Sequence, residues 1–256
     1  MKLGSSLQLL TLLQDKGYDA QMLGRLLRKL LTRFRKPQPE PTTREVIASL
    51  GEPFTSVLCS MYDREPQLGA GGRYYSTDAD TRISPRQGMW IYRLIRDTKP
   101  ENTLEIGLGF GFSTAYFLAA IQSNGKGSHL ALDPYQDRDW NGVGLTREKV
   151  LNIKLGAFLF SCEDLVQGLA RLAREQRRFC VIFIDGDHKF DSALMDFSLA
   201  SLVCEPGGHI ILDDLWMPSI QRLVSFSRRN RVDFTEVPTP IFRLAVFRKT
   251  DIDKRI

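Results

Sequence analysis

The chain has 256 residues, of which 43% are hydrophobic and 25% are charged, as expected for a soluble α/β domain with an extension. No run approaches the ~18 consecutive apolar residues of a membrane span. The leucine-rich start is interrupted by polar residues and lacks a small-residue cleavage site, so we expect no signal peptide. Four widely spaced cysteines without a C-x-x-C pair predict reduced thiols and a cytoplasmic location.

The net charge of +5 comes from one short segment. Residues 21–36 contain six basic residues and no acid, so the rest of the chain sums to −1. The leucines of this segment fall on one helical face, which predicts a basic amphipathic helical extension over residues 1–36. This helix could lie on an anionic membrane or dock on a partner. We favour the alternative, in which it packs on the core or on a second subunit of a homo-oligomer. The near-neutral remainder argues against nucleic acid as a partner.

Residues 37–82 are predicted to be a linker, a helix and a glycine-rich loop that forms a lid. Alternate prolines at 37–41 exclude a helix there. Thr42–Asp63 is expected to be helical, with Thr42 or Thr43 as its cap. A second helix is expected over Met89–Thr98, and the main domain over residues 83–256.

A glycine-rich turn follows the first predicted strand of that domain. Thr103–Ile106 is apolar enough for a buried strand, and Gly107, Gly109 and Gly111 precede an apolar stretch of helical length. Strand, turn and helix form the first unit of a nucleotide-binding α/β fold, in which glycines let a ligand approach the backbone. A dinucleotide fingerprint would need a third glycine at 112, which is Phe, so an NAD-dependent oxidoreductase is disfavoured. Glu105, at the strand end, could pair with a cationic group of the ligand.

This E-x-G-x-G-x-G stretch resembles motif I of the class I S-adenosylmethionine-dependent methyltransferases. The resemblance implies that S-adenosylmethionine is the cofactor and that Glu105 and the three glycines bind it. Asp133 ends the second strand, where an acid can accept hydrogen bonds from ribose hydroxyls. If the fold is as proposed, Cys162 and Glu163 lie beside the adenine, although Glu163 could equally complement a helix dipole. In similar O-methyltransferases the segment around Ile83 passes over the cofactor.

Three acids follow two further predicted strands. Phe179–Ile184 runs into Asp185, and His209–Leu212 ends in Asp213 and Asp214. Carboxyl ends of neighbouring parallel strands lie at one sheet edge, so these carboxylates could converge on one ion. Hard oxygen ligands suit Mg²⁺, Mn²⁺ or Ca²⁺ rather than zinc. The alternative is that Asp213 and Asp214 cap the next segment and Asp185 holds a loop.

The same three positions resemble the cation site of catechol and caffeoyl-CoA-type O-methyltransferases, with Asp214 in place of an asparagine. FIDGDHKFDSALMDF and EPGGHIILDDLWMPS also resemble a class I family related to enzymes that modify natural-product sugars, over about residues 83–231. Where catechol-type enzymes place a lysine base, this chain has His188. The resemblance implies that His188 takes the proton of the substrate hydroxyl and that Asp185 positions this hydroxyl.

Taken together, we expect a Rossmann-like class I methyltransferase with a seven-stranded, mostly parallel sheet, helices on both faces and an antiparallel pair at the C-terminal end. The expected activity is O-methyl transfer to a small molecule or sugar, assisted by a divalent cation, with Mg²⁺ expected. Two alternatives stay open. One is a metal-independent methyltransferase of the same fold, and the other is a non-catalytic membrane- or partner-binding protein that retains it.

Overall fold

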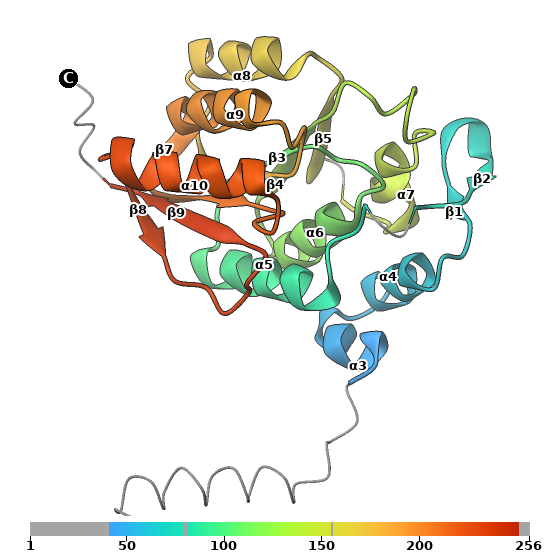
Figure 1. Cartoon of the computed structure of the whole chain (residues 1–256). Helices are drawn as coiled ribbons and strands as arrows, with labels where there is room; N and C mark the ends of the chain where they lie inside the picture. Colours follow the sequence, from blue (N-terminus) through green and yellow to red (C-terminus); the bar gives the residue numbers. More distant parts are fainter. Residues whose placement is uncertain (1–40, 79–80, 155, 251–256) are drawn as a thin grey trace, which may run out of the picture. The chain divides into compact units, whose positions relative to one another are not determined.

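The computed structural model describes residues 41–78, 81–154 and 156–250 (Figure 1). The basic segment 1–36, including the membrane or partner contact expected for residues 21–36, lies outside the described residues. Residues 42–256 form one compact unit. Within the described part of the chain, no helix is both long and apolar enough to cross a membrane.

A seven-stranded sheet organises this unit, in the order β5-β4-β3-β6-β7-β9-β8. β5, β4, β3, β6 and β7 are parallel to one another, β9 is antiparallel to β7, and β8 is antiparallel to β9. The predicted sheet and its antiparallel end are therefore confirmed. The strands are β3 (Asn102–Ile106), β4 (Ser128–Leu132), β5 (Phe158–Ser161), β6 (Phe179–Ile184), β7 (Cys204–Leu212), β8 (Phe234–Val237) and β9 (Ala245–Lys249).

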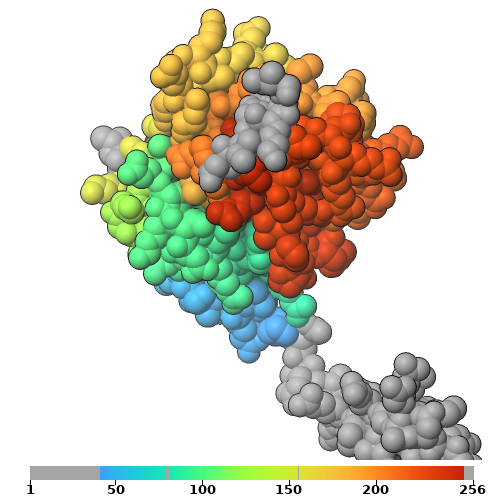
Figure 2. Space-filling view, turned by 90° about the vertical axis from the view of Figure 1, so that its left-hand side faces the viewer, coloured from blue at the N-terminus to red at the C-terminus, as the bar shows by residue number. Residues whose placement is uncertain are grey.

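Helices cover the two faces of the sheet (Figure 1). On one face, α5 packs on α6, and on the other α9 packs between α8 and α10. Two separate clusters of buried apolar side chains lie beneath these layers, as expected for parallel strands buried on both sides. The main helices are α5 (Pro85–Thr98), α6 (Phe112–Asn124), α8 (Leu165–Arg174), α9 (Phe190–Val203) and α10 (Pro218–Asn230). In Figure 2 the orange and red C-terminal elements form much of the visible surface.

The segment before the sheet differs from the single helix predicted over Thr42–Asp63. It contains α3 (Thr43–Ile47), a 3₁₀ turn (Ala48–Leu50) and α4 (Phe54–Tyr62). Gly51 has φ +75°, and Pro53 cannot donate a backbone hydrogen bond, so a continuous helix is excluded. The predicted cap is present, because Thr42 and Glu45 form a capping box.

The remaining connections are short elements. A small antiparallel ribbon pairs β1 (Gln67–Leu68) with β2 (Tyr74–Tyr75) around a 3₁₀ turn (Ala70–Gly72). Another 3₁₀ turn (Gly144–Thr146) leads into α7 (Arg147–Val150) between β4 and β5. α5 begins at Pro85, four residues earlier than predicted, because Ser84 and Gln87 form a second capping box.

Candidate functional site

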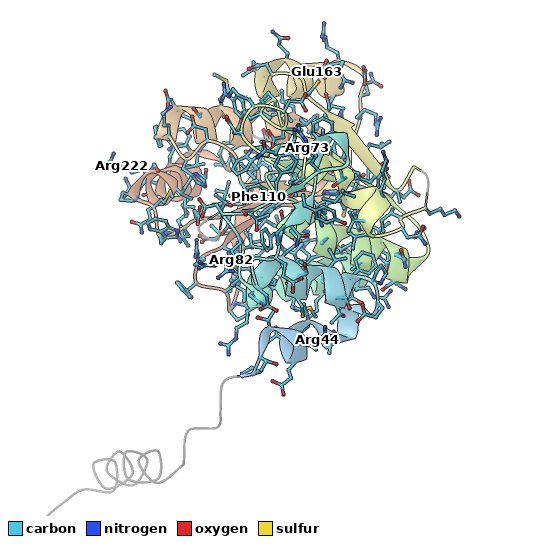
Figure 3. All side chains as sticks on the ribbon, turned by 90° about the vertical axis from the view of Figure 1, so that its right-hand side faces the viewer. Arg44, Arg73, Arg82, Phe110, Glu163 and Arg222 are labelled. Atoms are coloured by element: carbon cyan, nitrogen blue, oxygen red, sulfur yellow. The ribbon has the colours of Figure 1, made fainter. Side chains whose placement is uncertain are left out.

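A cavity of about 690 Å³ opens at the carboxyl ends of the parallel strands. Its wall is built by the segments that follow β3, β4, β6 and β7, by the start of α8 and by residues 81–83. In a doubly wound sheet this edge is where ligands bind. Phe110, which lines the cavity, lies near the centre of the view in Figure 3, and Arg82 lies below it.

The three glycines of the turn after β3 have three different physical roles. A methyl group on Gly107 would lie 2.1 Å from the backbone oxygen of Asp185, so this glycine lets β3 and β6 end side by side. Gly109 has φ +54°, and a methyl group built on it would have no atom within 4 Å. This glycine lines the cavity. Gly111 is not part of the wall, because its α-carbon packs against the Arg147 side chain. Of the three predicted glycines, Gly107 and Gly109 line the cavity and Gly111 does not.

Glu105 does not face the cavity either. It is fully buried, and its carboxylate accepts hydrogen bonds from the Ser113 and Thr114 hydroxyls at the start of α6. The Nε2 atom of His129 on β4 lies 3.0 Å from Glu105 Oε2. Sequence reasoning placed this acid on the ligand because strand ends usually point to the site. Here its side chain joins β3 to β4 and α6, which is a structural role.

Asp133 lies where predicted, at the tip of β4 and in the cavity wall. Its Oδ2 accepts from the backbone N–H groups of Leu108 and Gly109 at 3.1 and 2.9 Å and from Gln136 Nε2 at 2.8 Å. Its Oδ1 accepts only from the N–H of Tyr135 among the described residues, so one oxygen keeps accepting capacity toward a ligand.

The two residues predicted to lie beside the adenine do not line the cavity. Neither Cys162 nor Glu163 lines the cavity, and Asp164–Val166 does. The Glu163 carboxylate instead accepts hydrogen bonds from the Arg171 guanidinium, and in Figure 3 Glu163 lies at the top of the molecule, away from Phe110. Asp164 caps α8, which turns the preceding two side chains outward. Ile83 is buried and lines the cavity, as predicted.

Asp185, His188 and Asp214 come together at the cavity floor. His188 Nε2 lies 2.9 Å from Asp214 Oδ2 and 3.5 Å from Asp185 Oδ1. One donor atom from each of the three residues lies within 4.8 Å of the others, a spacing that could hold a metal ion. The predicted set had Asp213 in place of His188. Asp213 Oδ1 instead accepts from Gln87 Nε2 and from the N–H of Asp214, both at 2.7 Å.

The charges of this group are strongly perturbed. Hydrogen bonds to Asp185 and Asp214 raise the pKa of His188 to about 10. Burial raises the pKa of Asp185, and burial together with the charge of Asp185 raises the pKa of Asp213 to about 8. Burial opposes ionisation of Asp214, but hydrogen bonds from His188, Arg243 and Trp216 outweigh it and lower its pKa to about 2. The acids outnumber the cations here, and the carboxylates favour added positive charge.

Comparison with known proteins bears directly on this geometry. Residues 104–215 match the family model of a methyltransferase domain. The matched segment runs from β3 to just beyond β7, and it contains the glycine turn, Asp133 and all three residues of the floor group. A search of curated protein sequences finds no match.

Solved structures show the same fold at low sequence identity. The O-methyltransferase TomG from Streptomyces achromogenes, in complex with S-adenosylmethionine, has a TM-score of 0.58 and 17% identity over 78% of this chain and 91% of that one. An O-methyltransferase from Bacillus cereus with S-adenosylhomocysteine gives 0.53 and 19%, over 88% and 97%. A putative caffeoyl-CoA O-methyltransferase from Staphylococcus aureus gives 0.59 and 14%, over 80% and 96%. The described part of this chain therefore has the Rossmann-like fold of these methyltransferase structures.

Some residues that contact the acids of the cavity carry no sequence signal of their own. Arg243, from the loop between β8 and β9, donates to Asp214 Oδ1, which also accepts from Trp216 Nε1 at 2.7 Å. Gln87 reaches Asp213 from the first turn of α5, 126 residues away in the chain. An antiparallel last pair and a capping box were both predictable, but the side chains that they aim at the site were not.

Proposed function

We propose that this protein transfers a methyl group from S-adenosylmethionine to a hydroxyl oxygen of a small molecule or sugar, and that a divalent cation assists it. The observation that carries the proposal is one cavity whose wall joins the glycine turn and Asp133 to the Asp185–His188–Asp214 group. The first half suits an adenosyl amino acid, and the second half suits a hydroxyl that must lose its proton.

In this proposal the two halves have separate tasks. Gly107, Gly109 and Asp133 hold the cofactor so that its sulfonium methyl faces the cavity floor. The acceptor oxygen attacks that methyl carbon in line, the carbon–sulfur bond breaks, and the electron pair stays on sulfur as a neutral thioether. His188 receives the hydroxyl proton. Holding both reactants in one cavity supplies much of the rate acceleration, because displacement at the methyl carbon needs alignment above all.

The donor set fits a divalent cation. Asp185 and Asp214 offer carboxylate oxygens, which suit Mg²⁺ or Mn²⁺ and leave the His188 imidazole to accept the proton. A bound cation would supply Lewis acidity toward the acceptor oxygen. His188 is paired with both carboxylates, which raise its pKa, so a cation bound by those carboxylates would lower that pKa and favour the neutral imidazole as proton acceptor.

The experiment is calorimetric titration with S-adenosylhomocysteine, with and without Mg²⁺ or Mn²⁺. We expect micromolar binding that weakens at least about tenfold in Asp133→Ala, because the ribose acceptor and the anchor of the glycine turn are lost together. Absence of binding under every condition would leave only the fold.

A metal-independent mechanism is the second candidate. The observation that favours it is the position of His188 Nε2, 2.9 Å from Asp214 Oδ2 and 3.5 Å from Asp185 Oδ1, because two carboxylates can orient the imidazole. Methyl transfer to catechol or to a reducing sugar after exhaustive chelation separates the two. Activity that survives chelation and disappears in His188→Ala supports the metal-free mechanism, and activity restored only by added Mn²⁺ or Mg²⁺ supports the cation.

A further inference from the structure

One carboxyl group in the cavity wall is left without a partner. Asp196 lies in the second turn of α9, is 3% exposed, and lines the cavity. Its Oδ2 has no hydrogen-bond partner among the described residues. A buried polar atom in this state lowers the stability of the folded protein unless something binds it. The neighbouring acids are engaged, since Asp164 caps α8 and Asp187 accepts from Ser192 Oγ.

Asp196 lies close to the part of the cavity wall that is formed by the start of α8. A methyl group built on Gly186 would lie 3.4 Å from Asp196 Oδ2 and 3.8 Å from Leu165 Cδ1. Asp196 therefore lies between the end of β6 and the start of α8, close to the Asp164–Val166 wall. In the proposed function, Asp133 and the glycine turn hold the ribose and the amino-acid part of the cofactor. The base then extends along the wall formed by Asp164–Val166.

The chemistry of the group suits a base edge. Burial, and then the negative charges of Asp187 on the preceding loop and of Asp164 on α8, raise the pKa of Asp196 to about 7. A protonated carboxyl group has one O–H donor and one C=O acceptor, the same pair that a side-chain amide offers. Amide side chains form two hydrogen bonds with adenine by donating to a ring nitrogen and accepting from the 6-amino group.

We propose that Asp196 recognises the adenine of the cofactor, with its O–H donating to N7 and its C=O accepting from the 6-amino group. This inference rests on the proposed function, because it takes S-adenosylmethionine as the ligand. The other occupant of suitable chemistry is an ammonium group of the methyl acceptor, which would bind the ionised carboxylate. Replacing the 6-amino group of the purine distinguishes these two occupants, because it weakens nucleoside binding through Asp196 only if Asp196 contacts the base.

The test compares two nucleosides on three proteins. Wild type, Asp196→Asn and Asp196→Ala are titrated at pH 6.5 with S-adenosylhomocysteine and with S-inosylhomocysteine, in which oxygen replaces the 6-amino group. We expect wild type to prefer the adenosyl compound at least about tenfold, the value of one good bidentate pair. Asp196→Asn keeps its affinity within about threefold, because the amide offers the same donor and acceptor. Asp196→Ala loses about tenfold, and its preference falls below about threefold.

The matched control is Asp97→Asn, which removes an exposed carboxylate from α5, outside the cavity wall, and is expected to leave both affinities unchanged. An unaltered preference in Asp196→Ala overturns the inference and assigns the carboxyl to the acceptor or to the fold. Loss of more than about tenfold in Asp196→Asn, with unfolding temperature unchanged, also overturns it. If wild type binds neither nucleoside, the proposed function itself fails, and this inference fails with it.

Discussion

At the cavity floor, one carboxylate receives hydrogen bonds from three different segments of the chain. Asp214 Oδ1 accepts from Trp216 and Arg243, and Oδ2 lies 2.9 Å from His188 Nε2. Asp214 also has φ +52°, a conformation that non-glycine residues adopt only where the surroundings hold them. The residue is thus fixed in backbone and side chain, and two positive charges already compete for it.

Removal of one of these charges changes the affinity of the floor group for a cation. In Arg243→Gln we expect Mn²⁺ to bind about three- to tenfold more tightly, because a guanidinium within hydrogen-bond distance both repels the ion and occupies Oδ1. The measurement is calorimetric titration with MnCl₂, with Arg248→Gln as the control, since the Arg248 side chain donates to the backbone oxygen of Gly207 and lies outside the cavity wall. Weaker Mn²⁺ binding in Arg243→Gln would show instead that the guanidinium holds Asp214 in a ligating orientation.

Asp196 gives a prediction about stability that does not depend on any ligand. Its pKa is about 7 in the folded protein and near 4 when unfolded, so between these values the unfolded state releases a proton that the native state retains. Stability contributed by this group is therefore present below about pH 4 and is lost as the pH rises to 7. We expect Asp196→Asn to be more stable than wild type at pH 8 and to match it at pH 4, as measured by urea unfolding. Equal stability at pH 8 would contradict the burial of an unpaired carboxyl.

Among the elements, β3, β4 and α6 are joined by one buried polar network. Glu105 accepts from Ser113, Thr114 and His129, and the other ring nitrogen of His129 lies 2.9 Å from Thr103 Oγ1. The His129 ring also stacks on Phe117 with centroids 4.4 Å apart. This network fixes the start of α6 over the sheet, directly behind the glycine turn.

Loss of the network is expected to affect stability more than ligand binding. Glu105→Ala leaves three buried donors without an acceptor, which should lower the free energy of unfolding by about 3 kcal/mol. S-adenosylhomocysteine should still raise the unfolding temperature of the variant, because Glu105 does not line the cavity. If the ligand-induced increase vanished while the variant stayed folded, Glu105 would contact the cofactor after all.

The contact between α5 and α6 depends on a glycine. A methyl group on Gly88 would lie 2.2 Å from the Tyr116 ring, and both residues are buried. Gly88→Ala must therefore move α5 away from α6, with an expected loss of about 2 kcal/mol despite the better helix propensity of alanine. Guanidinium unfolding measures it, with Gln122→Ala on the exposed side of α6 as the control. A stability gain would mean that Tyr116 adopts another rotamer without strain.

At the scale of the whole molecule, backbone patterns predicted more than side-chain directions did. Apolar runs and glycine turns predicted the individual strands, because periodicity and turn chemistry are local, and the resemblance to class I methyltransferases implied the antiparallel end. They also placed Asp133, Asp185, His188 and Asp214 at one sheet edge. They could not tell that Glu105 turns into the core, because that depends on hydroxyls eight and nine residues later that reach back to it.

A truncation tests how the chain is divided. Because residues 42–256 form one compact unit, a protein that lacks residues 1–41 is expected to unfold at about the same temperature and to keep its affinity for S-adenosylhomocysteine. Sedimentation with phosphatidylserine vesicles then compares the two lengths, since six basic residues lie in 21–36. If the full-length protein fails to sediment, the remaining interpretation is that the basic segment packs on the core or on a second subunit. A truncated protein that no longer binds the nucleoside would make the extension part of the site.

The bond from Asp133 to two consecutive backbone N–H groups has a consequence for how fast the site works. The turn at Leu108 and Gly109 is held before any ligand arrives, so its conformational entropy is lost during folding and not on binding. Association of the nucleoside should then proceed in one kinetic phase whose rate rises linearly with concentration, without a saturating loop-ordering step. Differences in affinity among site variants should appear as differences in residence time.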